Sequence, residues 1–269
     1  MTLIGAAILG IIQGLTEFLP VSSSAHLILA RAFFGWDAEG FGLAFDVSVH
    51  AGTLLAVAVF FRRELAAMAV SVPAALCSNP EGPARLLWLV VVGTLPILPA
   101  GVFYTEAVEA LLRTPGLAAA MLALGAAALL VVERVGARRR DESSLSLGEA
   151  FWIGVGQAAA LVPGVSRSGA TIALGMFFGL RREAAARYAF LLGVPAIAAA
   201  ASREGVELLR SGMTEEMAIL FGVGTATSAV VGYLTVKYFI RFLSGHSLDG
   251  FAYYRLVLAA VTVVWITVH

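Results

Sequence analysis

Two short segments of this sequence carry polar side chains whose types and spacing could perform chemistry. The first reads EFLPVSSSAH and contains Glu17, three serines (Ser22, Ser23 and Ser24) and His26. The second reads VPGVSRSGAT and places an arginine between two serines. Proline removes a backbone donor and ends a helix, and a serine after it can cap the next helix. Each segment is therefore predicted to be a break between two helices.

The first break offers a carboxylate, hydroxyls and an imidazole. Glu17 lies four residues after Gln13, so the two side chains share one helix face. His26 follows Ser22 by four residues and Ser23 by three, so its ring can reach either hydroxyl across one helical turn. These groups can supply a nucleophile and a base, or a carboxylate ligand for a metal ion.

The second break is suited to holding an anion. Small residues at the start of a helix expose backbone amides, and an arginine beside them can bind phosphate oxygens in pairs. The residues expected to do this are Gly164, Ser166, Arg167, Ser168 and Thr171. An anion holder, a nucleophile and a base together fit phosphoryl transfer, in which positioning and charge neutralisation do most of the work.

Each of these groups also has a structural alternative. Glu17 and Arg167 could form an ion pair that only locks the two breaks together. Any single serine is more often a helix cap than a catalytic group, and Ser22, the first of the three, is best placed to cap the restarting helix. His50 lies four residues after Asp46, and a structural hydrogen bond between them is at least as well supported as a catalytic role.

The composition excludes a soluble enzyme, a disordered protein and a nucleic-acid binder. Of the 269 residues, 59% are hydrophobic and 13% are charged, and the mean hydropathy is +0.89. Soluble chains are about half apolar and about one quarter charged. The net charge is zero, and a single cysteine, Cys77, excludes an internal disulfide and a cysteine-based metal site. The N-terminal segment has no basic start and no convincing cleavage site, so we expect it to be retained.

Six apolar stretches are long enough to cross a bilayer, which takes about 20 residues. Residues 3–34 and 148–180 are also apolar, but the two breaks interrupt them in the middle. Irregular backbone survives at membrane depth only where it is buried in protein or lines a cavity. We therefore interpret these two segments as re-entrant helical hairpins. The six predicted spans cover 42–61, 86–104, 117–135, 187–202, 217–236 and 252–268.

Basic residues gather in the loops of one face. Of the 18 lysines and arginines, 13 fall in these loops, including Arg255; 4 fall in the opposite loops, and Arg167 lies in a hairpin. The positive-inside rule places the 13 in the cytoplasm, so both termini are predicted to lie outside. The basic loops are 62–85, 134–147, 181–187 and 237–255.

The sequence also contains an internal repeat. A shift of 144 residues brings Gln13 onto Gln157 and Ser22 onto Ser166 without gaps. Short segments rich in glycine and serine match by chance fairly often, but each half also reads as one hairpin followed by three spans. An odd number of spans inverts the second half, and such repeats place the working site near the midplane.

The expected fold is an all-α polytopic membrane protein. Six transmembrane helices and two re-entrant helical hairpins would form an inverted-topology repeat, in which the hairpin tips meet. We expect a single membrane domain over 1–269, with halves at about 1–135 and 148–269 joined by a basic cytoplasmic loop, 136–147.

The two motifs resemble a known family. QGLTEFLPVSSSAH and PGVSRSGAT, together with FDVSVHAGTLLAV followed by FFRRE, are similar to the signatures of the bacterial undecaprenyl-diphosphate phosphatases of the bacitracin-resistance type. The resemblance covers essentially the whole chain. It implies an enzyme of the bacterial inner membrane that hydrolyses undecaprenyl diphosphate to undecaprenyl phosphate and phosphate. This reaction recycles the lipid carrier for peptidoglycan synthesis and confers bacitracin resistance.

The resemblance also implies roles for individual residues. Glu17, Ser23, His26 and Arg167 would be catalytic, with Ser23 as the preferred nucleophile and His26 as its base or orienting partner. Attack by His26 or by water remains open. The phosphate would be bound by Ser22, Gly164, Ser166, Arg167, Ser168 and Thr171.

Glu17 would bind a divalent cation, Mg2+ or Ca2+, with Gln13 as a second ligand, or would act as a base. Some members have glutamate where this chain has Gln13, so the model of a metal held by two carboxylates is weakened here. The site would face the outer side of the membrane.

Two other classes remain as alternatives. A polyprenyl-phosphate flippase, or another secondary transporter, would need the same anion site and the same broken helices. A purely structural scaffold does not explain an arginine within the membrane. The expected partners are the lipid substrate and the surrounding bilayer, with no nucleic acid. The oligomeric state stays open, with a homodimer as one alternative.

Overall fold

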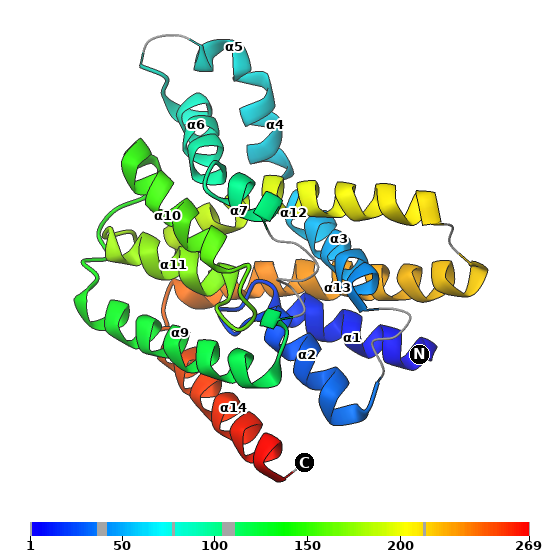
Figure 1. The fold of residues 1–269 in the computed structure, drawn as a ribbon. Coiled ribbons are helices and arrows are strands. Elements are labelled where there is room, and N and C mark those ends of the chain that lie inside the picture. Colours follow the sequence, from blue (N-terminus) through cyan, green and yellow to red (C-terminus); the bar gives the residue numbers. More distant parts are fainter. Residues whose placement is uncertain (1, 37–41, 77–78, 104–110, 212–213, 269) are drawn as a thin grey trace.

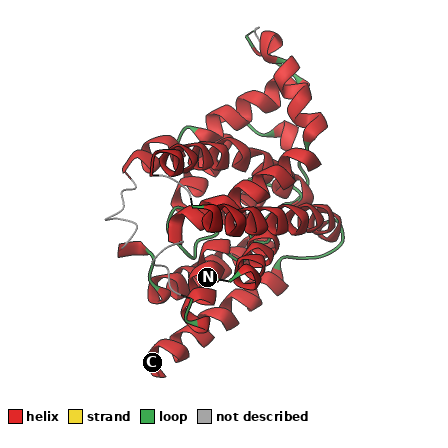
Figure 2. Ribbon diagram, turned by 90° about the vertical axis from the view of Figure 1, so that its right-hand side faces the viewer, coloured by secondary structure: helices red, strands yellow, loops and turns green. Residues whose placement is uncertain are grey.

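The computed structural model describes residues 2–36, 42–76, 79–103, 111–211 and 214–268, and in this part of the chain it contains helices and no strand (Figures 1 and 2). The predicted all-α class is therefore confirmed. The helices are α1 (Leu3–Thr16), α2 (Ser23–Phe34), α3 (Gly42–Phe60), α4 (Arg62–Val70), α5 (Val72–Ala75), α6 (Gly82–Thr94), α7 (Ile97–Phe103), α9 (Pro115–Val135), the short 3-10 helix η1 (Glu142–Ser144), α10 (Leu147–Ala159), α11 (Arg167–Phe177), α12 (Arg182–Ser211), α13 (Glu215–Leu243) and α14 (Asp249–Val268).

Five segments are long and apolar enough to cross a membrane. A sixth is possible if α3 and α4, which are bent by 75° against each other, form one span. All six predicted stretches overlap these segments. The helices α12 and α13 run to 30 and 29 residues, longer than the predicted stretches 187–202 and 217–236, because they continue through charged residues at their ends. The five segments are Gly82–Phe103, Pro115–Val135, Arg182–Ser202, Glu215–Leu243 and Asp249–Val268.

The two segments predicted to be hairpins each form a pair of helices. α1 and α2 are joined by residues 17–22, and α10 and α11 by residues 160–166. In Figure 1 the open ends of the two pairs lie on opposite sides, and their connecting loops meet near the centre of the molecule. The hydroxyl of Ser168 donates a hydrogen bond to the carbonyl of Leu19 at 2.9 Å, which ties one loop to the other.

Glycines allow the first hairpin to pack closely against α13. A Cβ atom added at Gly10 would lie 2.5 Å from the carbonyl oxygen of Gly224, and one at Gly14 would lie 2.9 Å from the backbone nitrogen of Gly232. Small residues let helix backbones approach in this way within membranes, where packing replaces the hydrophobic effect. The close packing fixes the height of α1, and so of the polar residues at its end.

The outer surface of the helices is apolar, as a lipid-exposed surface requires. On α14, for example, Val257, Val261 and Val264 are each at least half exposed. α12 is the most deeply enclosed span, with 56% of its apolar window buried, against 33% or less for the other four. The polar groups described below therefore lie inside a bundle that is apolar outside.

The loop between α9 and α10 is held by arginines. Arg140 donates two hydrogen bonds to the carboxylate of Glu149 and one to the carbonyl of Phe178. Arg138 pairs with Glu133, so the basic run in this loop has structural partners as well as its expected topological role.

One basic residue was assigned to the wrong place. Arg255, predicted to belong to a basic loop, lies in the second turn of α14 and is completely buried. The predicted loop 237–255 and the predicted span 252–268 overlapped at this residue, and the structure supports the span, because α14 begins at Asp249.

Candidate active site

The two breaks share an unusual backbone turn. Ser22 and Ser166, which the repeat places 144 residues apart, have φ angles of 73° and 72°. Residues with a side chain rarely adopt this left-handed region. Each serine directly precedes its helix, and each hydroxyl lies within 3.3 Å of the hydroxyl two residues later. The two breaks therefore have the same local construction.

The two serines differ in capping. The hydroxyl of Ser166 accepts a hydrogen bond from the backbone N–H of Gly169 at 3.1 Å, which caps α11. Ser22 occupies the same position before α2, but its side chain makes no capping hydrogen bond. The expectation that Ser22 caps the restarting helix is therefore wrong; its hydroxyl lies against that of Ser24 instead.

The carboxylate of Glu17 is the centre of the polar interior. Oε1 accepts a hydrogen bond from Arg167, and Oε2 accepts one from Ser23 at 2.7 Å and one from the amide of Gln13 at 2.8 Å. The ring nitrogen Nε2 of His50 lies 3.3 Å from Oε2. The Glu17 side chain is only 3% exposed, so α1, α2, α3 and α11 together enclose one carboxylate.

Ser23 and His26 do not pair as predicted. Ser23 donates to Glu17, whereas Nδ1 of His26 lies 2.8 Å from the carbonyl of Ser22 and Nε2 lies 2.7 Å from the hydroxyl of Tyr254. Side chains on a helix tilt towards its N-terminus, so Ser23, the first residue of α2, points back across the break to Glu17. One turn later, His26 faces α14. Tyr254 is thus a site residue that the motifs do not identify.

His50 is a second residue that the sequence analysis left undecided. Its Nδ1 lies 2.7 Å from the backbone carbonyl of Asp46, and its Nε2 points to Glu17. The hydrogen bond to Asp46 is therefore structural, as one of the two alternatives in the sequence analysis stated. It also orients the imidazole ring of His50 towards Glu17. The side chain of Asp46 binds Arg31 and Arg113 instead. The sequence feature that could have identified His50 as a site residue is the presence of a histidine within an apolar span.

In the second break, Arg167 reaches Glu17 while its neighbours bind backbone. The hydroxyl of Thr171 donates to the carbonyl of Arg167 at 2.7 Å, and that of Ser168 donates to the first break. Ser166, Ser168 and Thr171 are all buried. Gly164 has a φ of 97°, and a Cβ there would lie 2.5 Å from the carbonyl of Ala118. These residues hold the turn from which Arg167 projects.

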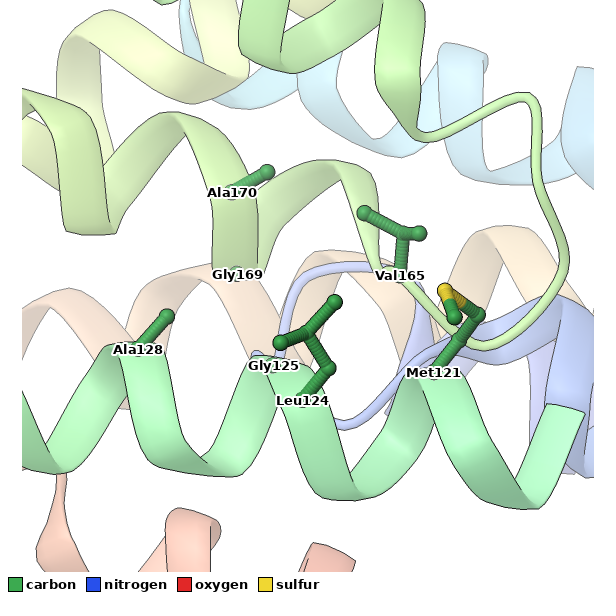
Figure 3. Close-up of a pocket in the computed structure, with 7 residues that line it drawn as sticks. All are labelled: Met121, Leu124, Gly125, Ala128, Val165, Gly169 and Ala170. Atoms are coloured by element: carbon green, nitrogen blue, oxygen red, sulfur yellow. The ribbon is translucent and has the colours of Figure 1, made fainter.

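An apolar cavity of about 180 Å3 lies beside the second break, between α9 and α11 (Figure 3). It is not the polar site, because none of Glu17, Ser23 and Arg167 is among the residues that line it. The lining consists of Met121, Leu124, Gly125, Ala128, Val165, Gly169 and Ala170.

Some of the groups at and beside Glu17 carry oxygen atoms that suit a hard cation. Within the described residues, no group of three histidine, cysteine or acidic side chains could hold a metal ion. The buried Oε1 of Gln13, however, has no hydrogen-bond partner and lies on the residue that also bonds Glu17. A carboxylate, this amide oxygen and the hydroxyl of Ser23 fit Mg2+ or Ca2+ when phosphate oxygens supply the remaining ligands.

Comparisons with known proteins agree with the motifs. A family model described as "Bacitracin resistance protein BacA" matches residues 6–261. An undecaprenyl-diphosphatase from Rubrobacter xylanophilus is 48% identical over 264 residues, which are 97% of each chain. One from Trichlorobacter lovleyi is 42% identical over 95% of this chain and 94% of its own, and an undecaprenyl-diphosphatase 2 from Stutzerimonas stutzeri is 42% identical over 98% of both. The resemblance that the two motifs indicated is confirmed: the chain belongs to the bacitracin resistance protein BacA family.

Proposed function

We propose that the protein hydrolyses undecaprenyl diphosphate to undecaprenyl phosphate and inorganic phosphate. The relatives that match over nearly their whole length carry the name undecaprenyl-diphosphatase. The observation that carries the proposal is the hydrogen-bonded set in which Glu17 joins Ser23 of one break to Arg167 of the other. A hydroxyl, a base and a guanidinium are the groups that hydrolysis of a phosphoric anhydride needs.

Substrate binding would exchange the partner of Arg167. The guanidinium leaves Glu17 and binds the terminal phosphate through two N–H groups, because phosphate matches its planar fork. Glu17 is then free to accept a proton from Ser23. The pocket around the phosphate is shaped by the other predicted binding residues: Ser22, Gly164, Ser166, Ser168 and Thr171.

Ser23 would then attack the terminal phosphorus. Its proton passes to the Glu17 carboxylate, 2.7 Å away, while the bond from phosphorus to the bridging oxygen breaks and undecaprenyl phosphate leaves with the electron pair. Water next attacks the phosphoserine and passes its proton to the released phosphate. Ser23 regains its own proton from Glu17. His26 orients the start of α2, because its ring nitrogens are directed to Ser22 and Tyr254.

A divalent cation, Mg2+ or Ca2+, is part of the proposal. Glu17 and the Oε1 atom of Gln13 would hold it. When bound, the cation neutralises charge on the phosphate oxygens.

The orientation and the repeat also belong to the proposal. The charge distribution supports a cytoplasmic loop at 136–147 between two inverted halves, 1–135 and 148–269, with both termini and the site on the outer side of the inner membrane. The matched turns at Ser22 and Ser166 support the repeat. The polyprenyl tail would lie between spans, among bilayer lipids. The product returns as carrier for peptidoglycan synthesis, and removal of the diphosphate, which bacitracin sequesters, gives resistance.

The transport alternative needs the same anion site but no nucleophile. The names of the relatives do not favour it, and a flippase would not require the hydrogen bond from Ser23 to Glu17. Both activities can be measured on the same purified protein.

The direct test is phosphate release from undecaprenyl diphosphate by protein purified in detergent. The wild type should release phosphate, and a chelator should reduce the rate. Glu17→Gln should abolish it, because it removes the base while conserving the size of the side chain. Release that is no faster in the wild type than in Glu17→Gln would contradict the proposal; lipid movement in vesicles without release would favour the flippase.

A further inference from the structure

Arg255 is the largest completely buried side chain in the described part of the protein. Its guanidinium donates five hydrogen bonds, and all of them end on backbone carbonyls rather than on a carboxylate. The acceptors are the carbonyls of Pro20, Met121, Leu122, Gly164 and Val165, at distances from 2.9 to 3.1 Å.

The acceptors explain why a charge is buried here. Pro20 lies in the first break, and Gly164 and Val165 lie in the second, where the helices are interrupted and carbonyls lose their partners within the helix. An unpaired carbonyl in an apolar interior is costly, and so is an unpaired charge. One guanidinium, whose Nη2 group is shared among three of the five carbonyls, bonds both breaks and α9 together.

Two glycines make room for this guanidinium. A Cβ atom added at Gly125 would lie 1.9 Å from Nη2 of Arg255, and one at Gly169 would lie 3.0 Å from Nη1. Gly169 belongs to the second motif, but its position is explained by Arg255 rather than by a phosphate. The neighbouring side chain on α14, Tyr254, bonds His26.

We infer that Arg255 is a positioning residue that fixes the two breaks against each other and so aligns Ser23, Glu17 and Arg167. Pro20 precedes Ser23 by three residues, and Val165 precedes Arg167 by two, so the five hydrogen bonds act next to the reacting groups. This inference rests on the proposed phosphatase function. It assigns Arg255 no contact with the substrate.

The test compares Arg255→Lys with Arg140→Lys. Arg140 is a matched control, because it also donates five hydrogen bonds but holds the loop between the halves. Lysine keeps the charge and has only three donors from one nitrogen, so it cannot span both breaks. Arg255→Lys should lower kcat about 100-fold, the cost of a displacement of about 1 Å, with KM nearly unchanged. Arg140→Lys should keep kcat close to the wild type.

Hydrogen exchange gives a measurement that does not depend on activity. Amides of residues 17–22 and 160–166 should exchange faster in Arg255→Lys and not in Arg140→Lys. If Arg255→Lys fails to fold, Gly125→Ala serves instead, because its methyl group displaces the guanidinium without removing it. It should give the same loss of kcat and the same local exchange.

The outcomes separate this inference from the proposed function. If the wild type is inactive but the two breaks exchange faster in Arg255→Lys, the phosphatase function and the effect of Arg255 on kcat are both refuted. Only the structural role of its hydrogen bonds then remains. An active wild type with normal kcat in folded Arg255→Lys, or in Gly125→Ala, would overturn the positioning role. A raised KM at unchanged kcat would also overturn it, since it would indicate substrate binding.

Discussion

Glu17 and Arg167 are 150 residues apart in the sequence, and their side chains are hydrogen-bonded where the two breaks meet. The Glu17 side chain is 3% exposed and that of Arg167 is 21% exposed, so the guanidinium is the more accessible partner of the pair. An ion pair of this kind is weak evidence for stability, because desolvation offsets much of the attraction. Its value for function is that an incoming phosphate can replace Glu17 as the partner of Arg167.

The first prediction separates the phosphate clamp from a structural lock. Arg167→Lys keeps a charge for Glu17 but loses the planar fork that binds phosphate in two places. Phosphate release should fall by about 100-fold, the size expected when a preorganised donor to the phosphoryl group is lost, while the thermal midpoint in detergent changes little. Turnover near that of the wild type would show that the ion pair between Glu17 and Arg167 only holds the two breaks together.

The second prediction concerns the nucleophile. Ser23→Ala removes the hydroxyl that donates to Glu17, so turnover should be abolished in a protein that still folds. Ser24→Ala should be mild, because its hydroxyl lies only against that of Ser22 at 3.3 Å. Phosphate release and thermal stability of both variants are the measurements. Full activity in Ser23→Ala would leave direct attack by His26 or by water as the mechanism.

The third prediction uses the two equivalent turns. Ser166→Ala loses the cap on Gly169 and should lower the free energy of unfolding by about 1 kcal/mol. Ser22→Ala loses no cap and should be nearly neutral, whereas Ser22→Gly should stabilise the protein, because glycine adopts a φ of 73° without strain. Denaturant unfolding of the three variants in detergent checks the order. An equal loss in both alanine variants would contradict the difference in capping.

Much of this arrangement follows from local sequence. Proline with serines predicts the breaks, and hydropathy predicts the spans, because both depend on neighbouring residues. The pairing of Ser23 could not be predicted, since the left-handed turn at Ser22 decides which way Ser23 points. The spacing in the sequence allowed His26 as the partner of Ser23, but in the structure Ser23 donates its hydrogen bond to Glu17 instead.

Arg255 and Tyr254 were missed for a different reason. They lie near the end of the chain, and their partners are backbone carbonyls and a histidine at least 90 residues away in the sequence. No local pattern marks such residues. Hydropathy placed Arg255 within the predicted span 252–268, but its charge led to its assignment to the loop 237–255.

The fourth prediction concerns the metal ion. Gln13→Glu adds a second carboxylate beside Glu17, where some family members have glutamate, and should lower the concentration of Mg2+ or Ca2+ needed for half-maximal activity. Gln13→Leu removes the unpartnered Oε1 oxygen and should raise it. Phosphate release titrated with each ion after treatment with a chelator gives both values. Activity that is independent of the ion in all three proteins would exclude this metal site.

The last prediction concerns the contact that fixes the loop between the halves. Glu149 lies in the first turn of α10, outside the spans, and its hydrogen bonds from Arg140 lower its pKa from 4.5 to about 2. A lowered pKa means that the folded protein favours the ionised form, so this contact stabilises the fold fully above pH 4.5 and is lost as the pH falls towards 2. Glu149→Gln should therefore unfold at a lower temperature than the wild type at pH 7, and the gap between them should narrow as the pH falls below 4.5. The measurement is the difference in thermal midpoint between the two proteins from pH 7 to pH 3, which cancels the titration of all other carboxylates. A gap that stays constant over this range would mean that the shape of the hydrogen bonds, and not the charge of Glu149, holds the loop.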